Sequence, residues 1–336
     1  MSRVHRMASG PSAASATPYD PVPATRRTMR PVPSDPLSDL PLALGGLSRA
    51  TEERARATLL PDLLADPGTV VLDLAGDAMP VQATAGGDLS VARRHPDPED
   101  AERLALFLGR DDAGTAYVAV VHPTRPEAQA PWQTLRVVGE RLDRVDAGLF
   151  ATASALANWH AAHVRCPRCG APTESAHGGW VRRCIADGTE HYPRSDPAVI
   201  MSVLDRHDRL LLSRGATWPE RRFSVQAGFV EPGESLEAAV AREVREEVGL
   251  DVGEITYLGN QPWPFPASLM VGFTCRTDRP DLRLDPGEIA EARWVSRPEY
   301  LGALASGEII TPTGISIAKR IIERWLGHPV PTSPLP

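Results

Sequence analysis

The sequence is poor in cysteine, in aromatic residues and in long apolar runs. Four cysteines among 336 residues are too few for a disulfide scaffold. No stretch approaches the run of about 18 apolar residues that crosses a bilayer, and no apolar secretory core follows the first residues. These absences lead us to expect a cytoplasmic protein in a reducing compartment, with no membrane partner.

An excess of positive charge is also missing, because the formal net charge is −7. Such a chain is poorly suited to extensive binding of a nucleic-acid backbone, which requires many basic side chains. An acidic protein can still handle phosphates by recruiting divalent cations. The hydrophobic fraction of 42% and the charged fraction of 24% are typical of soluble globular proteins, and the length allows two domains.

Composition divides the chain into five segments. Residues 1–38 are rich in Pro, Ser, Ala and Arg without an apolar period, so we expect a disordered extension. Residues 39–162 show strand patterns and one helix but no catalytic constellation, which indicates a scaffold or dimerisation domain. Residues 163–195 hold a cysteine cluster that resembles a zinc ribbon. Strands and helices alternate irregularly over residues 196–327, which predicts a mixed sheet flanked by helices, and residues 328–336 should be a loose tail.

Hydrophobic periodicity and turn residues predict the individual elements. In the first half we expect a helix over residues 146–163 with Asp146 as its N-cap, and strands at 69–74, 104–109 and 116–122. In the second half we expect helices at 236–248 and about 316–326, and strands at 198–205, 209–215, 269–277 and 291–295.

Three of the four cysteines lie close together in the sequence. Cys166 and Cys169 enclose a Pro-Arg pair and form half of a zinc knuckle, and Cys184 follows a Gly-Gly turn. The fourth cysteine of a complete ribbon is missing, but Asp187 or His191 offers an oxygen or nitrogen ligand. Two interpretations stay open: a closed, structural Zn²⁺ site, and a degenerate ribbon without metal.

The segment from 228 to 250 carries an unusual group of carboxylates. Its apolar residues recur every four positions and form one stripe, made of Leu236, Val240, Val244 and Val248. Glu243, Glu246 and Glu247 share one side of the same helix, and Glu247 falls within the arc of the stripe. Three adjacent carboxylates repel one another unless a cation lies between them, and Mg²⁺ prefers oxygen ligands. The alternative is a charged helix face in solvent.

The stretch NQPWPFPAS, residues 260–268, alternates three prolines with Trp263 and Phe265. Proline fixes φ and lacks a backbone N–H, so we expect a stiff loop rather than a helix or a central strand. Two large rings on a rigid loop favour ligand contact, since a preformed wall loses little entropy on binding. The alternative is that both rings pack in the core.

Two patterns resemble a known family. The glycine, arginine and glutamate spacing matches every fixed position of the Nudix box: Gly228, Glu234, Arg242-Glu243-Val244, Glu246-Glu247 and Gly249-Leu250. The stretch 261–268, the helix ending in Asn-Trp-His, the cysteine ribbon and the run from Tyr192 to Ile200 are similar to the NADH pyrophosphatase branch of that family. This resemblance covers residues 145–325 well and the preceding residues loosely. Asn260 and Asp187 depart from the branch, which has Ser and a fourth cysteine at those positions.

The resemblance implies an α+β fold, in which a Nudix α/β/α sandwich with a mixed sheet follows a zinc-ribbon-like insert and a smaller α/β N-terminal domain. It implies that Glu243 and Glu247 are the principal ligands of Mg²⁺ or Mn²⁺, with Glu246 as a further ligand or water-orienting group. The backbone carbonyl of Ala227 and the carboxylate of Glu288 join this metal shell in such proteins. By the same resemblance, Arg242 steadies the acidic cluster and Glu234 supports the junction between loop and helix.

The resemblance also implies which residues contact the substrate. The dinucleotide site is expected to be lined by Gln261, Pro262, Trp263, Pro264, Phe265, Pro266, Ala267 and Ser268. Tyr192, reaching in from a partner subunit, and Phe229 correspond to aromatic residues that hold a base between them. Ala318 is expected to offer a backbone contact, and Glu291 is a weaker candidate for the metal site.

The function implied by the resemblance is Mg²⁺- or Mn²⁺-dependent hydrolysis of NADH or NAD⁺ to nicotinamide mononucleotide and AMP, in a homodimer. In this branch the same site also removes NAD caps from RNA 5′ ends. Two alternatives remain: a Nudix hydrolase that prefers ADP-ribose or diadenosine polyphosphates, and a non-catalytic nucleotide- or RNA-binding regulator. The complete set of box carboxylates argues against the regulator. The sequence leaves open the physiological substrate, the general base, the true start codon and the role of the N-terminal domain.

Overall fold

The computed structural model describes residues 37, 40–42, 45, 47–128, 130–312 and 314–331. Residues from Asp35 onward form one compact unit. Apart from Leu37, the expected disordered extension lies outside the described residues, as does the end of the expected tail. Val330, at the start of that tail, is buried in the core, and its N–H donates to Glu323. None of the described helices is long and apolar enough to cross a bilayer.

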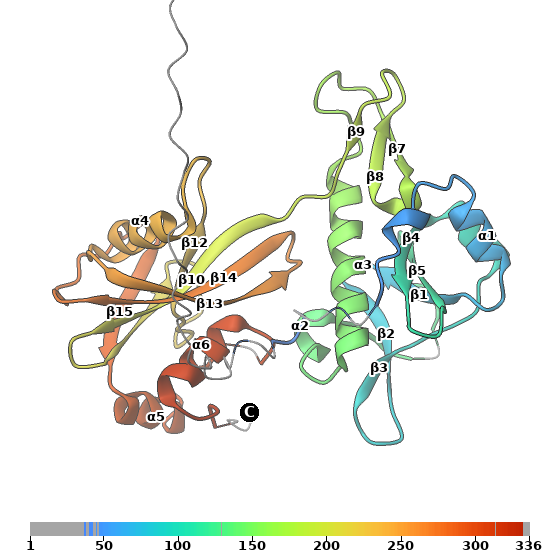
Figure 1. The fold of residues 1–336 in the computed structure, drawn as a ribbon. Helices are drawn as coiled ribbons and strands as arrows, with labels where there is room; N and C mark the ends of the chain where they lie inside the picture. Colours follow the sequence, from blue (N-terminus) through green and yellow to red (C-terminus); the bar gives the residue numbers. More distant parts are fainter. Residues whose placement is uncertain are drawn as a thin grey trace, which may run out of the picture. The chain divides into compact units, whose positions relative to one another are not determined.

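The N-terminal module, residues 47–162, is built on a six-stranded sheet (Figure 1). The strand order is β3-β2-β1-β5-β4, with β6 paired to β2, and the β1–β5 pair is parallel. The strands are β1 Val70–Ala75, β2 Ala78–Ala83, β3 Leu89–Val91, β4 Leu104–Arg110, β5 Ala116–His122 and β6 Trp132–Thr134. The helices are η1 Thr51–Glu53, α1 Leu59–Ala65, η2 Pro98–Glu102, α2 Leu135–Val138 and α3 Arg144–Ala162.

Alternating residues send this sheet's apolar side chains to two separate cores. On strand β4, Leu106 and Leu108 pack against α3, whereas Phe107 packs against α1 on the other face. This is the period of two that a strand buried on both faces requires. The sheet is therefore covered by helices on both sides.

The predicted N-cap of α3 is wrong. The helix begins at Arg144, and its cap is Asp143, whose carboxylate accepts a hydrogen bond of 2.8 Å from the N–H of Asp146. Asp146 itself is fully buried, accepts a hydrogen bond from the N–H of Val91 and pairs with Arg93. Two aspartates three residues apart both carry the cap signal, and the buried ion pair with Arg93 is a long-range contact that no local pattern reveals.

The ribbon, residues 163–195, is a small antiparallel sheet ordered β7-β8-β9. Its elements are β7 Thr173–Ala176, η3 His177–Gly179, β8 Val181–Cys184 and β9 Glu190–His191. Hydrogen bonds that involve Trp180, Gly179 and Arg182 fasten it to the N-terminal module. The Trp180 indole donates to the Phe107 carbonyl at 2.7 Å, and His160 Nε2 lies 2.8 Å from the Gly179 carbonyl.

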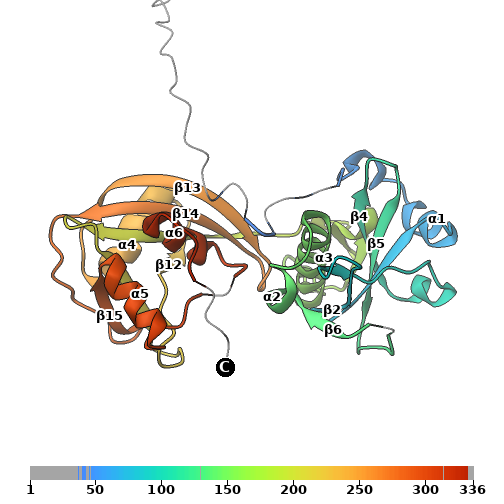
Figure 2. The same cartoon turned by 90° about the horizontal axis from the view of Figure 1, so that it is seen from below.

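The C-terminal module, residues 196–331, is an α/β/α sandwich (Figures 1 and 2). The sheet order is β13-β14-β10-β11-β15, with β12 paired to β10. The strands are β10 Asp196–Asp205, β11 Leu210–Gly215, β12 Gln226–Phe229, β13 Gly253–Trp263, β14 Ser268–Thr277 and β15 Ile289–Val295. The helices are α4 Leu236–Val248, α5 Arg297–Ala305 and α6 Ile317–Leu326.

Two cores fill this sandwich. One lies between the sheet and α4, and the other lies between the sheet and helices α5 and α6. Strands β10 and β14 are parallel in register from Asp196–Ser268 to Asp205–Thr277, whereas the other pairs are antiparallel. The mixed sheet flanked by helices confirms the predicted α+β fold.

The expected loop at residues 260–268 is only partly a loop. Asn260 to Trp263 are the last residues of β13, residues 264–267 form a turn, and Ser268 begins β14. The stretch is thus the tip of a β-hairpin, called here the signature hairpin. Strand β13 lies at the edge of the sheet, where Pro262 removes no interior ladder hydrogen bond. The exclusion of a central strand is correct, but the edge strand was not predicted.

Candidate active site

Helix α4 turns two of the three predicted carboxylates inward. Ser235 caps its first turn, accepting from the N–H of Ala238, and Gly249 ends it with φ 73°. Glu243 and Glu247 are each only 9% exposed, whereas the side chain of Glu246 is 59% exposed. The burial of Glu247 confirms that it falls within the arc of the valine stripe. The three carboxylates therefore occupy two different environments.

The buried carboxylates favour a proton or a cation. Burial, and then the charges of Glu243 and Glu288, raise the pKa of Glu247 to about 8, although Gln226 Nε2 lies 3.3 Å from its Oε2 atom. Burial also raises the pKa of Glu243, against the opposing effect of Arg242. A divalent cation replaces that proton and removes the repulsion. The Oε1 atom of Gln226 is buried without a hydrogen-bond partner among the described residues, so a further oxygen donor lies beside the pair. The donor set fits Mg²⁺ or Mn²⁺.

Arg242 holds the acidic cluster together from one side. Its guanidinium donates two hydrogen bonds to Glu234, at 2.7 and 2.8 Å. It also donates to Glu243 at 2.8 Å, to Glu246 at 2.9 Å and to the Phe229 carbonyl at 2.9 Å. Glu234 in turn accepts from the N–H of Glu231 in the loop before α4. Arg242 and Glu234 thus tie the loop to the helix, as the family resemblance implies.

Gly228 makes room for Glu243. A β-carbon at residue 228 would lie 1.9 Å from the carboxyl carbon of Glu243, so any side chain there displaces that carboxylate. Gly228 and Ala227 lie on β12, which pairs with β10 beside α4. The glycine of the box is therefore required by the close approach of strand and carboxylate.

Gln261 is fully buried and bonded to the backbone. Its Nε2 atom donates to the carbonyls of Pro41 and Ile315, both at 2.7 Å, and its Oε1 atom accepts from the N–H of Ile317 at 2.8 Å. The bonds to Ile315 and Ile317 join the edge strand to the start of α6, and the bond to Pro41 joins it to the segment before the N-terminal module. Ala318, the other residue expected to contact substrate here, lies on that same turn and is also buried.

The rings of the signature hairpin pack against the N-terminal module. Trp263 and Phe265 meet edge to face with their centroids 5.0 Å apart, and both contact that module's core. Asn158 on α3 donates to the carbonyls of Pro264 and Pro266, at 3.1 and 3.2 Å. Both rings therefore pack against the core, and Trp263 also lines the two cavities described next.

Two cavities border the signature hairpin. The first, called here the arginine cavity, has a volume of about 150 Å³ and includes in its lining Arg136, Trp218, Arg222, Ala227, Trp263 and Ala318. The second, called here the hairpin cavity, has a volume of about 260 Å³ and includes in its lining Arg49, Trp180, Arg194, Trp263, Pro264 and Ser268. Ala227 places the arginine cavity next to the strand that carries Gly228.

The remaining predicted residues lie outside both cavities. Tyr192 and Phe229 are 64% and 60% exposed, and the Tyr192 hydroxyl donates to Glu190. Glu288 is exposed and acts on Glu243 and Glu247 through its charge. Glu291 pairs with Arg214 at 3.9 Å. In the described part of the chain, neither Tyr192 nor Phe229 lines either of these two cavities, which Trp263 borders.

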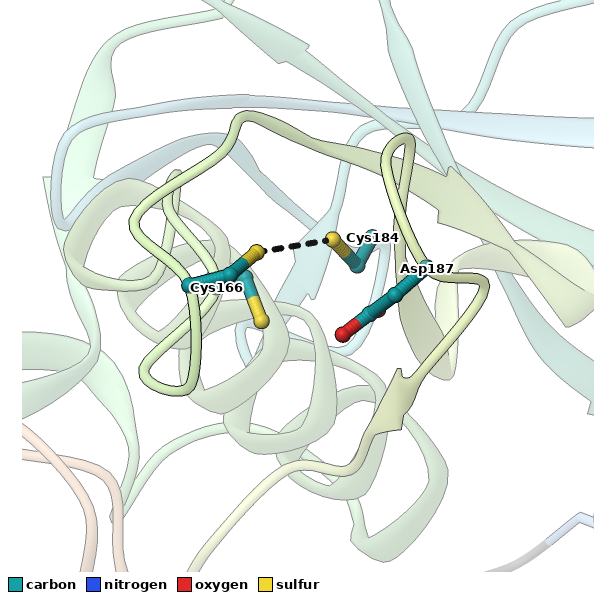
Figure 3. Close-up of side chains that lie close together, drawn as sticks. Cys166, Cys184 and Asp187 are labelled. Atoms are coloured by element: carbon teal, nitrogen blue, oxygen red, sulfur yellow. Dashed lines mark hydrogen bonds between the residues drawn. The ribbon is translucent and has the colours of Figure 1, made fainter.

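The cysteine cluster converges on one point. Ligand atoms of Cys166, Cys169, Cys184 and Asp187 lie within 4.8 Å of one another, and Figure 3 shows Asp187 directed toward the thiols of Cys166 and Cys184. Zinc–sulfur bonds of about 2.3 Å fit this spacing. His191 is not one of these four residues. Of the two candidates left open by the sequence, the structure brings Asp187 into the cluster.

Two of the four donors of this cluster have a lowered pKa, which favours their metal-binding forms. Burial opposes ionisation of the Cys166 thiol, but hydrogen bonds from the N–H groups of Cys169 and Arg168 prevail and lower its pKa to about 7. The N–H of Thr189 lowers the pKa of Asp187 to about 2, so this carboxylate is ionised at neutral pH. Thiolate and carboxylate are ligands that Zn²⁺ accepts, so the residues fit a structural zinc.

Three residues of the arginine cavity were missed in the sequence. Trp218 and Arg222 lie in the loop between β11 and β12, where no site residue was expected. An aromatic residue followed by basic ones was the available signal. Arg136 lies on α2, in the half where no site residue was expected, and no local pattern marks it.

Comparison with known proteins agrees with these features. Three family models match: "NADH pyrophosphatase-like rudimentary NUDIX domain" over residues 68–159, "NADH pyrophosphatase zinc ribbon domain" over 161–192 and "NUDIX domain" over 194–311. The NAD-capped RNA hydrolase NudC of Mycobacterium bovis (strain BCG / Pasteur 1173P2) is 47% identical over 244 residues, which is 68% of this chain and 76% of that one.

More distant relatives agree as well. The human NAD-capped RNA hydrolase NUDT12 is 33% identical over 282 residues, which is 80% of this chain and 60% of that one. The matched domains together cover the carboxylate helix, the ribbon and most of the N-terminal module. The chain belongs to the NADH pyrophosphatase, or NudC-type, branch of the Nudix hydrolases.

Proposed function

We propose that this protein hydrolyses the diphosphate of NADH or NAD⁺ to nicotinamide mononucleotide and AMP, and removes NAD caps from RNA 5′ ends. The observation that carries the proposal is the buried pair Glu243 and Glu247, whose burial and mutual repulsion favour a bound cation, next to a cavity walled by Trp263. The family and the names of the relatives, NAD-capped RNA hydrolases, support the choice of substrate.

Each polar residue of the site has a task in this reaction. Glu243, Glu247 and Glu288 would hold Mg²⁺ or Mn²⁺, with Glu246 and the Ala227 carbonyl as further ligands. A bound divalent cation neutralises the diphosphate and lowers the pKa of a coordinated water. Arg242 keeps Glu243 and Glu246 in place through its hydrogen bonds. Gln226 orients Glu247.

The assembly and its location form part of the same proposal. Tyr192 and Phe229 present exposed rings on the single chain, which supports a homodimer in which Tyr192 of one subunit completes the base site of the other. The residues from Pro262 to Ser268 would form the wall of that site. Zn²⁺ held by Cys166, Cys169, Cys184 and Asp187 would stabilise the ribbon, and three reduced cysteines accord with the cytoplasm.

Substrate comparison tests the proposed reaction. We expect kcat/KM in Mg²⁺ or Mn²⁺ to be higher for NADH than for ADP-ribose or diadenosine polyphosphates, with NAD-capped RNA also cleaved. Glu246→Gln and Glu247→Gln should each lower kcat by roughly 10²-fold or more, since each removes a metal-site charge. Glu237→Gln, on the exposed first turn of α4, is the matched control and should leave turnover unchanged.

Two outcomes would contradict the proposal. A higher kcat/KM for ADP-ribose than for NADH would indicate a Nudix hydrolase of another preference. Binding of NAD(H) or RNA without turnover of any substrate would indicate the non-catalytic regulator. Full turnover in both Glu246→Gln and Glu247→Gln would refute the metal assignment itself.

A further inference from the structure

Gln226 lies beside the buried carboxylates with half of its amide unpaired. The residue is 1% exposed and is the first of strand β12. Its Nε2 atom donates to the Oε2 atom of Glu247 over 3.3 Å, and its Oε1 atom is buried without a hydrogen-bond partner among the described residues. Gln261 is buried as deeply, but both ends of its amide are bonded to the backbone. Gln226 therefore differs from a glutamine whose role is only structural.

The register between β12 and α4 explains why Gln226 meets Glu247. Residues two apart on a strand share a face, and so do residues four apart on a helix. Two strand residues span about 6.6 Å and four helix residues about 6 Å, so the two spacings match. Gly228 accordingly faces Glu243, and Gln226 faces Glu247. Ala227, between them, packs on the other face of the strand and lines the arginine cavity.

The two buried carboxylates are held in different ways. At Glu243, Gly228 leaves the space that the carboxylate occupies, and Arg242 donates a hydrogen bond to it. At Glu247, the side chain of Gln226 fills the equivalent place on β12, and no basic side chain of the described residues forms an ion pair with the carboxylate. An ionised carboxylate only accepts hydrogen bonds, so the amide turns its nitrogen to Glu247 and leaves its oxygen for another group.

The surroundings of this amide oxygen favour a cation. A buried oxygen without a partner costs free energy, so the site gains when a donor or a cation reaches it. Glu243 and Glu288 bring their negative charges close to Glu247, which excludes an anion. Amide oxygens are among the ligands that hard divalent cations accept beside carboxylates. Gln226 thus offers the same cation a further oxygen.

We propose that Gln226 is a neutral ligand of the divalent cation, which it binds through Oε1 while Nε2 holds Glu247 in position. The inference rests on the proposed function for the presence of this cation. It deepens that function, because residue 226 lies outside the spacing of the Nudix box, residues 228–250. A neutral oxygen adds a ligand without adding to the repulsion between the carboxylates.

Metal binding without substrate tests this ligand. The full-length protein is dialysed against EDTA and then against buffer, and it is titrated with Mn²⁺ while electron paramagnetic resonance follows the free ion. Mn²⁺ prefers oxygen ligands, so it competes poorly for the thiolates of the ribbon. Gln226→Met removes both ends of the amide but keeps an unbranched side chain of similar size. We expect its Kd for Mn²⁺ to be roughly 10-fold higher than that of wild type.

A second substitution at the same position separates a ligand from a packing residue. Gln226→Glu keeps an oxygen at the site, so it should bind Mn²⁺ at least as tightly as wild type. With NADH as substrate, the Mn²⁺ concentration for half-maximal rate should rise roughly 10-fold in Gln226→Met and stay near the wild-type value in Gln226→Glu.

Thermal melting shows whether the effect comes from the fold. In EDTA, Gln226→Met should melt close to wild type, because it removes an unpaired oxygen together with one long hydrogen bond. Excess Mn²⁺ should raise the melting temperature of wild type more than that of this variant. Val203→Ala is the control, since Val203 lies in the core between the sheet and α4, two residues from the partner of Gln226 on β10. It should lower the melting temperature and leave the Kd for Mn²⁺ unchanged.

The outcomes separate this inference from the proposed function. An unchanged Kd for Mn²⁺ in Gln226→Met would overturn the assigned ligand even if NADH is hydrolysed. An equal loss of affinity in Gln226→Met and Gln226→Glu would also overturn it, since packing would then account for the effect. A loss confined to Gln226→Met supports the ligand even if NADH is a poor substrate.

Discussion

At the scale of single residues, the buried carboxylate of Glu247 should serve activity but lower the stability of the metal-free protein. Its folded pKa of about 8 exceeds the ordinary value of 4.5, so between these pH values the folded state holds a proton that the unfolded state has released. The free energy of unfolding of the metal-free protein therefore falls as pH rises through this window. Glu247→Gln should remove this loss, so we expect the variant to be more stable than wild type in EDTA at pH 8 while being inactive.

Thermal melts in EDTA measure this pH dependence of stability. They cover about pH 5.5 to 8.5, a range chosen around these pKa values. The melting temperature of wild type should fall more steeply with pH than that of Glu247→Gln, and Mg²⁺ should restore wild type most at high pH. Parallel pH profiles for the two proteins would contradict the assigned burial of this carboxylate. Glu237→Gln serves again as the control from the same helix.

The residue scale is also where the sequence predicted most. The spacing of Glu243, Glu246 and Glu247 on a helix placed them together, and the helical period placed Glu247 among the valines, which burial confirms. Helical periodicity could not predict that Arg136 stacks on the rings of the signature hairpin. That stacking depends on the docking of two modules whose contacting residues are more than a hundred positions apart.

At the scale of elements, Gln261 joins the edge strand β13 to helix α6. Gln261→Leu leaves two carbonyls and one N–H buried without their partner, and such groups cost about 1–3 kcal/mol each. We expect the free energy of unfolding to fall by about 3 kcal/mol in urea denaturation. Asn260→Ala, at the exposed neighbouring residue, should cost less than about 0.5 kcal/mol.

The Gln261→Leu variant also tests whether the side chain of Gln261 is structural or contacts the substrate. A loss of stability below about 1 kcal/mol, together with a higher KM for NADH, would favour the expectation that its side chain contacts the dinucleotide. The sequence identified this residue through the family resemblance but gave no sign of its three backbone partners. Pro41 and Ile315 lie far from it in sequence, and an isolated glutamine carries no pattern that reveals buried hydrogen bonds.

The ribbon offers a second test at this scale. Asp187→Asn keeps an acceptor for the Thr189 N–H but weakens the fourth zinc ligand, so we expect lower zinc affinity and a lower melting temperature. His191→Asn should keep one zinc per chain, because His191 lies outside the group of four. Zinc content after dialysis against a chelator measures both. Zinc retained by Asp187→Asn and lost by His191→Asn would reverse the assignment.

Elements were predicted well where their pattern is local. The helix of Leu236–Val248 and the strand of Leu210–Gly215 begin and end within a residue of the expected positions, because caps and periodicity mark them. The signature hairpin was missed as a hairpin, since prolines argue against strands in general. Only its place at the edge of the sheet, which depends on the whole topology, makes Pro262 acceptable in β13.

At the scale of the whole molecule, the N-terminal module contacts the candidate site. The sequence indicated a scaffold or dimerisation domain because no catalytic pattern occurs there. The structure adds contacts from this module to the signature hairpin, through Asn158 and Arg136. A module with no chemistry of its own can therefore still shape the site.

Trp263 borders both the arginine cavity and the hairpin cavity. One ring cannot shift for an occupant of one cavity without changing the shape of the other. If an occupant of the hairpin cavity alters affinity in the arginine cavity by some factor, thermodynamic linkage requires that an occupant of the arginine cavity alter affinity in the hairpin cavity by the same factor. Coupling of this kind would make the indole of Trp263 the contact that joins the two faces of the signature hairpin.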